Sequence, residues 1–520
     1  MNQRSMFRIA VVLIALAAVA AKYWLWPRGE NPSTAASVKG AAIVQAHDQR
    51  GFTLGTLAFE PCELDQRNSA ATTAAFCAPF DVPENWDKPD GRRINLKLAL
   101  VRSDAQVAER DLVVLLAGGP GQAATEVYPR AAAGFAPLLR RRNILLLDQR
   151  GTGDSHPLVC AQDPTDFDAA AVSEVDLSKV RELTQACLAD VARDADPAQY
   201  TTTAAVRDLE AVRQALGAPE FDLVGVSYGT RVAQQYLKRH PDGVRSIVLD
   251  SAVPNELVLG AEFAINLDEA LKAQFAECAR TPACTKAFGD PYANLYRLRD
   301  AVSVKPADIE MRHPRTFMPE RKPLNAYTLA ALVRLFAYSG ETSALLPLTI
   351  DRALAGDYAP LLAQAELLND ELADLSGNGM QLSVICAEDA DLLGDRSQDA
   401  GLILGDALVR VMRAQCAIWP RGSRPPDFHE PLHSDKPVLI LEGEFDPVTP
   451  PRYGEQIVKG LPNGRLLVAK GQGHSVMGRG CLPRLVNRFV ETLDAKTLDA
   501  GCIADFGPIP AFLDYNGAAP

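Results

Sequence analysis

The sequence predicts a doubly wound, mostly parallel α/β sheet with a large helical cap inserted between two of its core strands. Short, almost wholly apolar runs recur along the chain, as strands buried on both faces of a parallel sheet require. They span residues 112–117, 144–147, 221–226, 247–249, 438–441 and 466–469. Segments with helical periodicity lie between several of these runs, which is the strand–helix alternation of this class. Between residues 255 and 430 the alternation stops, and Ala, Leu and charged residues recur at helical spacing.

Residues 1–26 are predicted to be a signal peptide or an N-terminal membrane anchor. Arg4 and Arg8 precede an apolar stretch over residues 9–21, which ends near a small-residue cleavage motif, Ala-Val-Ala. Residues 22–26 instead resemble the interfacial aromatic belt of a retained anchor, so both outcomes stay open. Either outcome predicts an exported protein that is periplasmic, secreted or anchored to the outer face of the cytoplasmic membrane.

The ten cysteines predict disulfide bonds, because an even number behind an export signal favours a disulfide framework. Local bridges are the simplest proposal, since the cysteines fall along the chain as neighbours. Spacing does not determine connectivity, and a set of buried free thiols is the alternative. The neighbouring pairs are Cys62 and Cys77, Cys160 and Cys187, Cys278 and Cys284, Cys386 and Cys416, and Cys481 and Cys502.

The net charge of −12 argues against a nucleic-acid partner, because a phosphate-binding surface needs clustered Lys and Arg. Residues 429–433 read H-E-P-L-H and match the zinc motif H-E-x-x-H. Pro431 lies inside the motif, so we do not expect the continuous helix that would place both histidines on one side. We therefore predict neither a metal nor an organic cofactor.

Two elements of the first half of the chain have clear local signals. Alternation of apolar and polar residues over residues 94–101 predicts a half-buried edge strand. The clearest helix is predicted over residues 203–216, with Thr202 or Thr203 as N-cap and Gly217 as its stop.

The break in the strand rhythm divides the chain. We interpret the helical interval as a cap that is inserted between two strands of one sheet. A separate C-terminal domain is the alternative, but it would leave the last strands without a sheet. The predicted segments are a linker at 27–50, a first part of the core at 51–254, the cap at 255–430 and a second part of the core at 431–520.

Ser227 is the predicted nucleophile. The apolar run at 221–226 leads into G-V-S-Y-G at 225–229, and a helix-like stretch follows at 231–239. A strand that turns sharply into a helix at this point presents the hydroxyl at the mouth of the sheet, beside the positive end of the helix. The flanking glycines allow this turn without Cβ clashes.

His474 and Asp446 are predicted to complete a catalytic triad. A serine hydroxyl needs a base, and His474 stands out among the seven histidines because it follows the presumed last strand in G-Q-G-H. The base needs a carboxylate, and Asp446 lies in a loop rich in turn formers after the strand at 438–441. Glu442 and Glu444 are competitors for this role. The order serine, aspartate, histidine is the one expected on a doubly wound sheet.

Two backbone N–H groups are predicted to stabilise the oxyanion of a tetrahedral intermediate. One is the amide of Tyr228, directly after the nucleophile. The other is assigned to Gly119 in the G-G-P-G loop at 118–121, which follows the first apolar run. A Gly-Pro cluster after a strand is often only a turn, but its place in the order of strands favours the functional interpretation.

In combination, these motifs resemble the α/β-hydrolase serine aminopeptidases, a group that includes prolyl aminopeptidases and secreted tripeptidyl aminopeptidases. The resemblance covers roughly residues 59–502, and the tripeptidyl type is the more similar of the two. Besides the serine motif and the glycine loop, it rests on D-Q-R-G-T-G-D-S at 148–155, I-C-A-E-D at 385–389, C-A-I-W-P at 416–420 and G-E-F-D-P-V-T-P at 443–450.

The resemblance implies hydrolysis of small peptides from their free N-terminus, through an acyl-enzyme on Ser227. Recognition of an ammonium group calls for carboxylates in or under the cap, and Glu388 and Asp389 are the candidates by position and by resemblance. The alternative is that they only pair with a nearby Arg. Ala117 stands where prolyl aminopeptidases usually have His, which leaves room for residues other than proline or for longer N-terminal units.

Two other functions compete with this prediction. An esterase or amidase on the same scaffold is the first, because fold and triad do not fix the substrate. The second is a binding protein with a vestigial triad, which a serine-directed reagent would not label.

Overall fold

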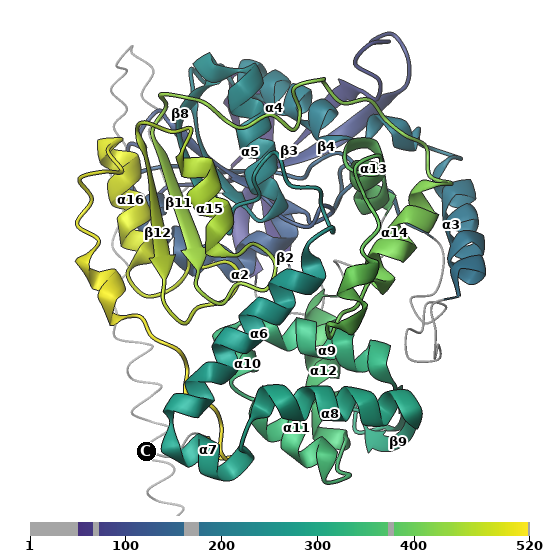
Figure 1. The fold of residues 1–520 in the computed structure, drawn as a ribbon. Coiled ribbons are helices and arrows are strands. Elements are labelled where there is room, and N and C mark those ends of the chain that lie inside the picture. Colours follow the sequence, from purple (N-terminus) through teal and green to yellow (C-terminus); the bar gives the residue numbers. More distant parts are fainter. Residues whose placement is uncertain (1–49, 66–71, 161–175, 373–378, 518–520) are drawn as a thin grey trace, which may run out of the picture. The chain divides into compact units, whose positions relative to one another are not determined.

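The computed structural model describes residues 50–65, 72–160, 176–372 and 379–517 (Figure 1). The predicted signal or anchor and nearly all of the linker lie outside these residues. Within them, no helix is long and apolar enough to cross a membrane.

Ten strands of the described chain form one sheet in the order β1-β2-β3-β4-β6-β5-β7-β8-β11-β12. Neighbours from β6 to β12 are parallel, and the pairs from β1 to β4, as well as β4 with β6, are antiparallel. The strands are β1 (Phe52–Leu54), β2 (Leu57–Asp65), β3 (Thr72–Pro83), β4 (Arg93–Val101), β5 (Leu112–Leu116), β6 (Ile144–Leu147), β7 (Phe221–Val226), β8 (Val244–Asp250), β11 (Val438–Gly443) and β12 (Gly464–Ala469).

Helices cover both faces of the sheet. Those on one face are α2 (Ala124–Leu139) and α16 (Leu482–Thr492), and those on the other include α4 (Thr202–Leu216), α5 (Tyr228–Arg239) and α15 (Pro451–Val458). On the first face, Phe135 of α2 shares an apolar cluster with Val113, and on the second, Leu209 of α4 shares one with Val114. Val113 and Val114 are consecutive residues of β5, whose side chains point to opposite faces. The predicted fold class is therefore confirmed.

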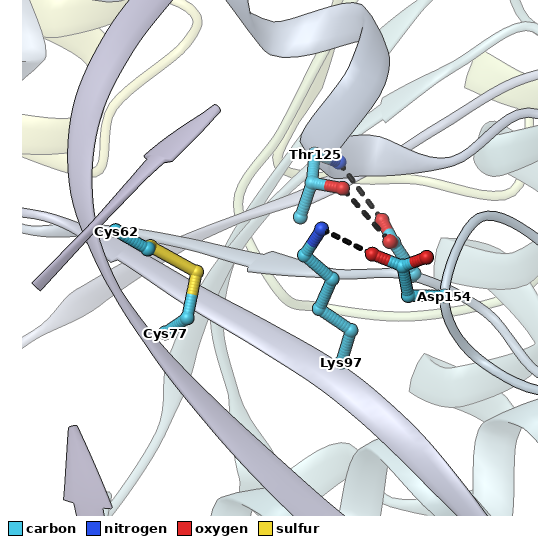
Figure 2. The surroundings of a disulfide bond; sticks show 6 residues. Cys62, Cys77, Lys97, Thr125 and Asp154 are labelled. Atoms are coloured by element: carbon cyan, nitrogen blue, oxygen red, sulfur yellow. Dashed lines mark hydrogen bonds and ion pairs between the residues drawn. A yellow bond between two sulfur atoms is a disulfide. The ribbon is translucent and has the colours of Figure 1, made fainter. Parts of the chain in front are cut away.

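The strand over residues 94–101 lies inside the sheet, so the prediction of an edge strand is wrong. β4 pairs with β3 on one side and with β6 on the other. Its polar side chains are satisfied there, because Asn95 donates to Asp81 at 2.9 Å and Lys97 forms an ion pair with Asp154 at 2.6 Å (Figure 2). The alternating pattern reflects these local partners and not an open edge.

The predicted helix begins one residue before the expected range. Thr201, and not Thr202 or Thr203, is the N-cap of α4, because its hydroxyl accepts a hydrogen bond from the Ala204 N–H at 3.2 Å. Three consecutive threonines offer the same capping chemistry, so the pattern alone could not select between them. Gly217 ends the helix in the left-handed region at φ 63°, as predicted.

The chain between β8 and β11 is mainly helical and has its own apolar cluster, with Leu271, Leu298, Leu329 and Ile350 among its members. Its helices are α6 (Phe263–Arg280), α7 (Pro282–Phe288), α8 (Pro291–Val304), α9 (Ala326–Ala337), α10 (Gly340–Ser343), α11 (Leu346–Leu354), α12 (Ala359–Leu372), α13 (Gly379–Glu388) and α14 (Ala407–Cys416). It also contains an antiparallel pair, β9 (Ala307–Arg312) and β10 (Pro319–Leu324), that the sequence analysis did not predict. These strands are short, rich in charged residues and only partly buried, and they lack an apolar run.

All ten cysteines form disulfide bonds, each with its neighbour along the chain. Cys62–Cys77 joins β2 to β3 (Figure 2), and Cys386–Cys416 joins α13 to α14. This connectivity is the simplest one that the spacing allowed. Five disulfides indicate folding in an oxidising compartment, as in a periplasmic or extracellular protein.

Candidate active site

Ser227 lies between β7 and α5 on a sharp turn. Its backbone has φ 54° and ψ −125°, a conformation that side-chain-bearing residues seldom adopt. A Cβ on Gly225 would lie 2.6 Å from the Gly229 carbonyl oxygen, and one on Gly229 would lie 2.0 Å from the Leu116 carbonyl oxygen. Both glycines of the motif are therefore required by the close approach of backbone to backbone.

The glycine loop after β5 lies against the serine. A Cβ on Gly118 would be 3.1 Å from the Ser227 Cβ, and Gly119 has φ 107°, which favours glycine. Tyr228, the other predicted oxyanion residue, is the first residue of α5 and is buried, so its N–H belongs to the unpaired first turn of that helix. The two predicted donors thus come from segments that meet at Ser227.

The D-Q-R-G-T-G-D-S motif at 148–155 anchors the elements around this loop. Asp148 accepts hydrogen bonds from the N–H and the hydroxyl of Thr125, both at 2.8 Å, and so holds the start of α2. Burial raises the pKa of Asp148 to about 6, although the bonds from Thr125 oppose this shift. Arg150 is buried and binds both carboxylate oxygens of Asp208 on α4 at 2.6 Å.

His474 and Asp446 form a close pair. His474 Nδ1 lies 2.7 Å from Asp446 Oδ2. The second oxygen, Oδ1, accepts hydrogen bonds from the N–H groups of Val448 and Thr449 at 2.8 Å, and the Thr449 hydroxyl donates to Oδ2. This shell of donors fixes the carboxylate in the loop after β11.

Each residue of this pair shifts the pKa of the other in the direction that favours its charged form. Burial alone would raise the pKa of Asp446, but the nearby His474 and the backbone N–H groups lower it below its usual range. Burial alone would lower the pKa of His474, but the charge and the hydrogen bond of Asp446 raise it above its ordinary value. Asp446 is thus held ionised, as a residue that stabilises an imidazolium must be.

The competing carboxylates bind other partners. Glu444 accepts a hydrogen bond from the Gly471 N–H at 2.8 Å. Glu442 accepts one from the Ala252 N–H at 3.1 Å, and burial together with the negative charges of Asp446 and Asp250 raises its pKa well above the ordinary value. A raised pKa favours the neutral carboxyl group, which is less suited than an ionised carboxylate to stabilise an imidazolium.

The cap contacts the loop that carries His474. Tyr338 lies just after α9, and its carbonyl oxygen accepts a hydrogen bond from the His474 N–H at 2.8 Å. The Tyr338 ring meets the His474 imidazole edge-on, with 5.3 Å between the ring centroids. A Cβ on Gly473 would lie 2.3 Å from this carbonyl oxygen. No sequence signal pointed to Tyr338, because this contact joins residues far apart in the chain.

Asp250 is a second residue beside the predicted triad that the sequence analysis missed. It is the last residue of β8, and its backbone and side chain bind the Ser227 turn and the His474 loop. A signal was present, because an aspartate directly after an apolar run at the carboxyl end of a parallel strand points to the site edge.

The acidic pair predicted for amine recognition lies in a buried network. Glu388 accepts hydrogen bonds from the N–H and the hydroxyl of Thr202 at 2.6 and 3.0 Å, and Arg231 binds Asp389 at 2.8 Å. Both carboxylates are fully buried, and burial raises the pKa of Glu388 to about 7. Thr202 also shares a hydrogen bond with the Tyr228 hydroxyl at 2.6 Å, so the network reaches the side chain of the predicted oxyanion residue. A substrate ammonium would have to enter this network to meet the pair.

The H-E-x-x-H segment is irregular and not helical. The two ring nitrogens of His429 lie 2.8 Å from the carbonyl oxygens of Asn255 and Glu388. In the part of the chain that the structure describes, no group of three or more His, Cys, Asp or Glu side chains could hold a metal ion.

Comparison with known proteins places this geometry in context. The model of a protein family described as having the alpha/beta hydrolase fold matches residues 111–478. The chain is 27% identical to the serine protease Hip1 of Mycobacterium tuberculosis over 472 residues, which cover 83% of this chain and 88% of that protein. It is 25% identical to a tripeptidyl aminopeptidase of Streptomyces coelicolor over 506 residues, with 91% and 90% covered. It is also 28% identical to a carboxylesterase B of Mycobacterium tuberculosis over 446 residues, with 80% and 84% covered.

Proposed function

The chain belongs to the α/β-hydrolase family, and we propose that it is a serine peptidase that releases residues from the free N-terminus of peptides. The observation that carries the proposal is the 2.7 Å contact between His474 Nδ1 and Asp446 Oδ2. Asp250 binds both the loop that carries His474 and the turn that carries Ser227. The peptidase relatives support the choice of a peptide substrate. The relatives reported above are named as a serine protease, a tripeptidyl aminopeptidase and a carboxylesterase, and all three names describe hydrolases.

The proposed reaction follows from these positions. His474 takes the proton from the Ser227 hydroxyl while the oxygen attacks the scissile carbonyl carbon, and the N–H groups of Tyr228 and Gly119 bind the resulting oxyanion. When the intermediate collapses, the carbon–nitrogen bond breaks and His474 gives its proton to the leaving amine. Water then attacks the acyl-enzyme with His474 again as base, which frees the N-terminal fragment and restores Ser227.

Glu388 and Asp389 remain the proposed partners of the substrate ammonium. Among the described residues, none donates a hydrogen bond to Asp389 Oδ1, so this buried oxygen has an acceptor site to offer. His429 Nε2 is its neighbour at 3.6 Å. A bound ammonium would supply the missing donor and would add a positive charge beside two carboxylates that share Arg231.

The test is a panel of aminoacyl and tripeptidyl fluorogenic amides, each with a free and an acetylated N-terminus, together with short-chain esters. We expect kcat/KM to be much higher for free amines, and the best chain length separates single-residue from tripeptidyl release. Ser227→Ala is the control and should lower kcat by a factor on the order of 10⁶. Indifference to acetylation, with esters cleaved fastest, would replace the peptidase proposal by an esterase.

The same panel tests the acidic pair. Glu388→Gln should raise KM for free-amine substrates and leave blocked esters nearly unaffected, because only the former present an ammonium group. An equal loss on both classes would show that Glu388 supports the fold and does not bind the amine.

An esterase is the second candidate, and its support is the similarity to a carboxylesterase. Labelling of Ser227 by a fluorophosphonate separates both enzymes from a binding protein with an inactive triad, because the reagent reacts only with an activated serine.

A further inference from the structure

Asp250 binds the two loops that must meet for the proposed reaction. Its backbone carbonyl oxygen accepts a hydrogen bond from the Ser227 N–H at 2.9 Å. Its carboxylate accepts one from the Val476 N–H at 2.8 Å and one from the Met477 N–H at 3.0 Å. These two residues follow His474 closely, so one buried residue fixes the base loop relative to the nucleophile turn.

The residues after Asp250 strengthen this link. The Ser251 hydroxyl oxygen accepts a hydrogen bond from the Ser475 N–H at 2.8 Å, and the Ser251 N–H donates to the Leu441 carbonyl oxygen of β11 at 2.8 Å. Ser251 and Ser475 have positive φ values of 59° and 65°. Such backbone strain persists only where the surroundings over-determine it, which marks this junction as one that is held in place.

We propose that Asp250 is a positioning residue of the serine reaction, whose carboxylate holds the His474 loop in register with Ser227 and whose charge faces the imidazolium that forms there. The inference rests on the proposed serine-hydrolase chemistry, but it does not depend on whether the substrate is a peptide or an ester.

The charge of Asp250 acts together with the other groups around His474. Asp446 and Asp250 raise the pKa of the imidazole, and Arg334 of the cap opposes them. Burial and the charges of Asp446 and Asp250 raise the pKa of Glu442, which favours its neutral form. Burial raises the pKa of Asp250 itself to about 6, against the effect of its two backbone donors and of His474. Acidification through this range therefore protonates both His474 and the group that holds its loop.

A protonated Asp250 would present a hydroxyl where the loop offers an N–H donor. The hydrogen bonds to the loop would then be weakened, because a neutral carboxyl group is a poorer acceptor than a carboxylate. The wild-type reaction should consequently lose activity with two protons on the acid side, and not with the single proton of His474.

The test measures the second-order rate of fluorophosphonate labelling at Ser227 from about pH 5 to about pH 8. We expect Asp250→Asn to label at least about tenfold more slowly at neutral pH, because a small displacement of a catalytic group is costly. The acid limb of Asp250→Asn should follow a slope of one in log rate against pH. The wild-type limb should be steeper than one over the pH range in which Asp250 also becomes protonated. The midpoint of the limb should also move to lower pH, because a negative charge near His474 has been removed.

Asp222→Asn is the matched control. Asp222 is equally buried at the start of β7, away from the carboxyl ends of the strands, where it binds Arg245 and Ser246. It should label like the wild type once its thermal unfolding shows that it is folded.

Each outcome decides the inference. Labelling of folded Asp250→Asn at the wild-type rate, with the wild-type pH profile, would overturn it and leave the proposed function intact. A wild type that does not label would overturn the proposed function, and this inference with it. If Asp250→Asn does not fold, Asp250→Glu decides, since it keeps the charge and displaces the carboxylate by one methylene. Slow labelling of this variant supports positioning, and a wild-type rate contradicts it.

Discussion

In the proposed reaction, the protonation state of His474 sets the pH range in which Ser227 can react. Because Asp446 raises the pKa of His474 above its ordinary value despite burial, the neutral imidazole that serves as base is lost as the pH falls through that raised value. We therefore expect the acid limb of kcat/KM to have its midpoint above about 6.5, the ordinary pKa of histidine. An activity optimum well below about pH 5 would contradict the role of His474 as base.

Replacement of the carboxylate tests the same pair directly. Asp446→Asn should lower kcat by a factor of about 10⁴, because an amide neither holds the correct tautomer nor stabilises the imidazolium. Glu444→Gln is the control, because that carboxylate binds the Gly471 N–H and has no direct contact with the imidazole in the described structure. Comparable losses in the two variants would mean that Asp446 acts through the loop and not through the charge.

At this scale, the sequence predicts a residue when its signal is local. Ser227 stands in a five-residue motif, and Asp446 and His474 each follow an apolar strand. Tyr338 had no such signal, because its contact with His474 is set by how the cap meets the core. Asp250 had the strand-end signal but no motif, so its bonds to Val476 and Met477 could be seen only in the fold.

The elements around the acidic pair are joined by one buried arginine. Arg231 on α5 binds Asp389, lies 3.8 Å from Glu388 at the end of α13, and packs over the ring of Phe428. Arg231→Met would leave both carboxylates without their cation, which typically costs about 3–5 kcal/mol for a buried pair. Urea unfolding of the oxidised protein measures this loss.

Arg424→Met is the matched control, because Arg424 binds Asp391 in a partly exposed pair with side-chain exposures of 22% and 49%. Exposed pairs contribute up to about 1 kcal/mol, so this variant should be nearly as stable as the wild type. If Arg231→Met were as stable as the wild type, the link that Arg231 makes between α5 and the acidic pair Glu388 and Asp389 would not contribute to stability.

Elements were predicted where their signal was strong and local. The buried parallel strands came from apolar runs, and α4 came from its periodicity and its glycine stop. β4 was placed at an edge because the pattern records which side chains are buried but not which strands lie beside them. The β9–β10 pair was missed because its sequence is rich in charged residues and contains no apolar run.

The C-terminal segment links the sheet to the cap. Figure 1 shows it, in yellow, running from the region of α16 towards α7. Cys481–Cys502 fixes its start, and beyond it Pro508 approaches Gly471 so closely that a Cβ there would lie 2.2 Å from the Pro508 nitrogen. Further on, the Phe512 N–H donates to the Ala344 carbonyl oxygen at 3.0 Å.

This segment contacts two stretches of the chain near His474, the proposed base. Gly471 belongs to the loop that carries His474, and Gly340, which Ile509 contacts, lies just after Tyr338. Phe512 and Leu513 pack on the apolar cluster of Phe288 and Leu348 in the cap. The segment therefore holds the loop of the base and the part of the cap that covers it in one arrangement.

A chain that ends after Gly507 should lose this arrangement. Large apolar side chains contribute about 1.5–3 kcal/mol each when fully buried, so loss of the partly buried Phe512, Leu513 and Ile509 should cost about 2–4 kcal/mol. Thermal unfolding measures the loss, and KM should rise because the cap is less firmly held over the site. A chain that ends after Tyr515 keeps all of these contacts and should behave like the wild type. If the shorter chain kept both its melting temperature and its KM, the segment would only cover the surface and would not hold the cap.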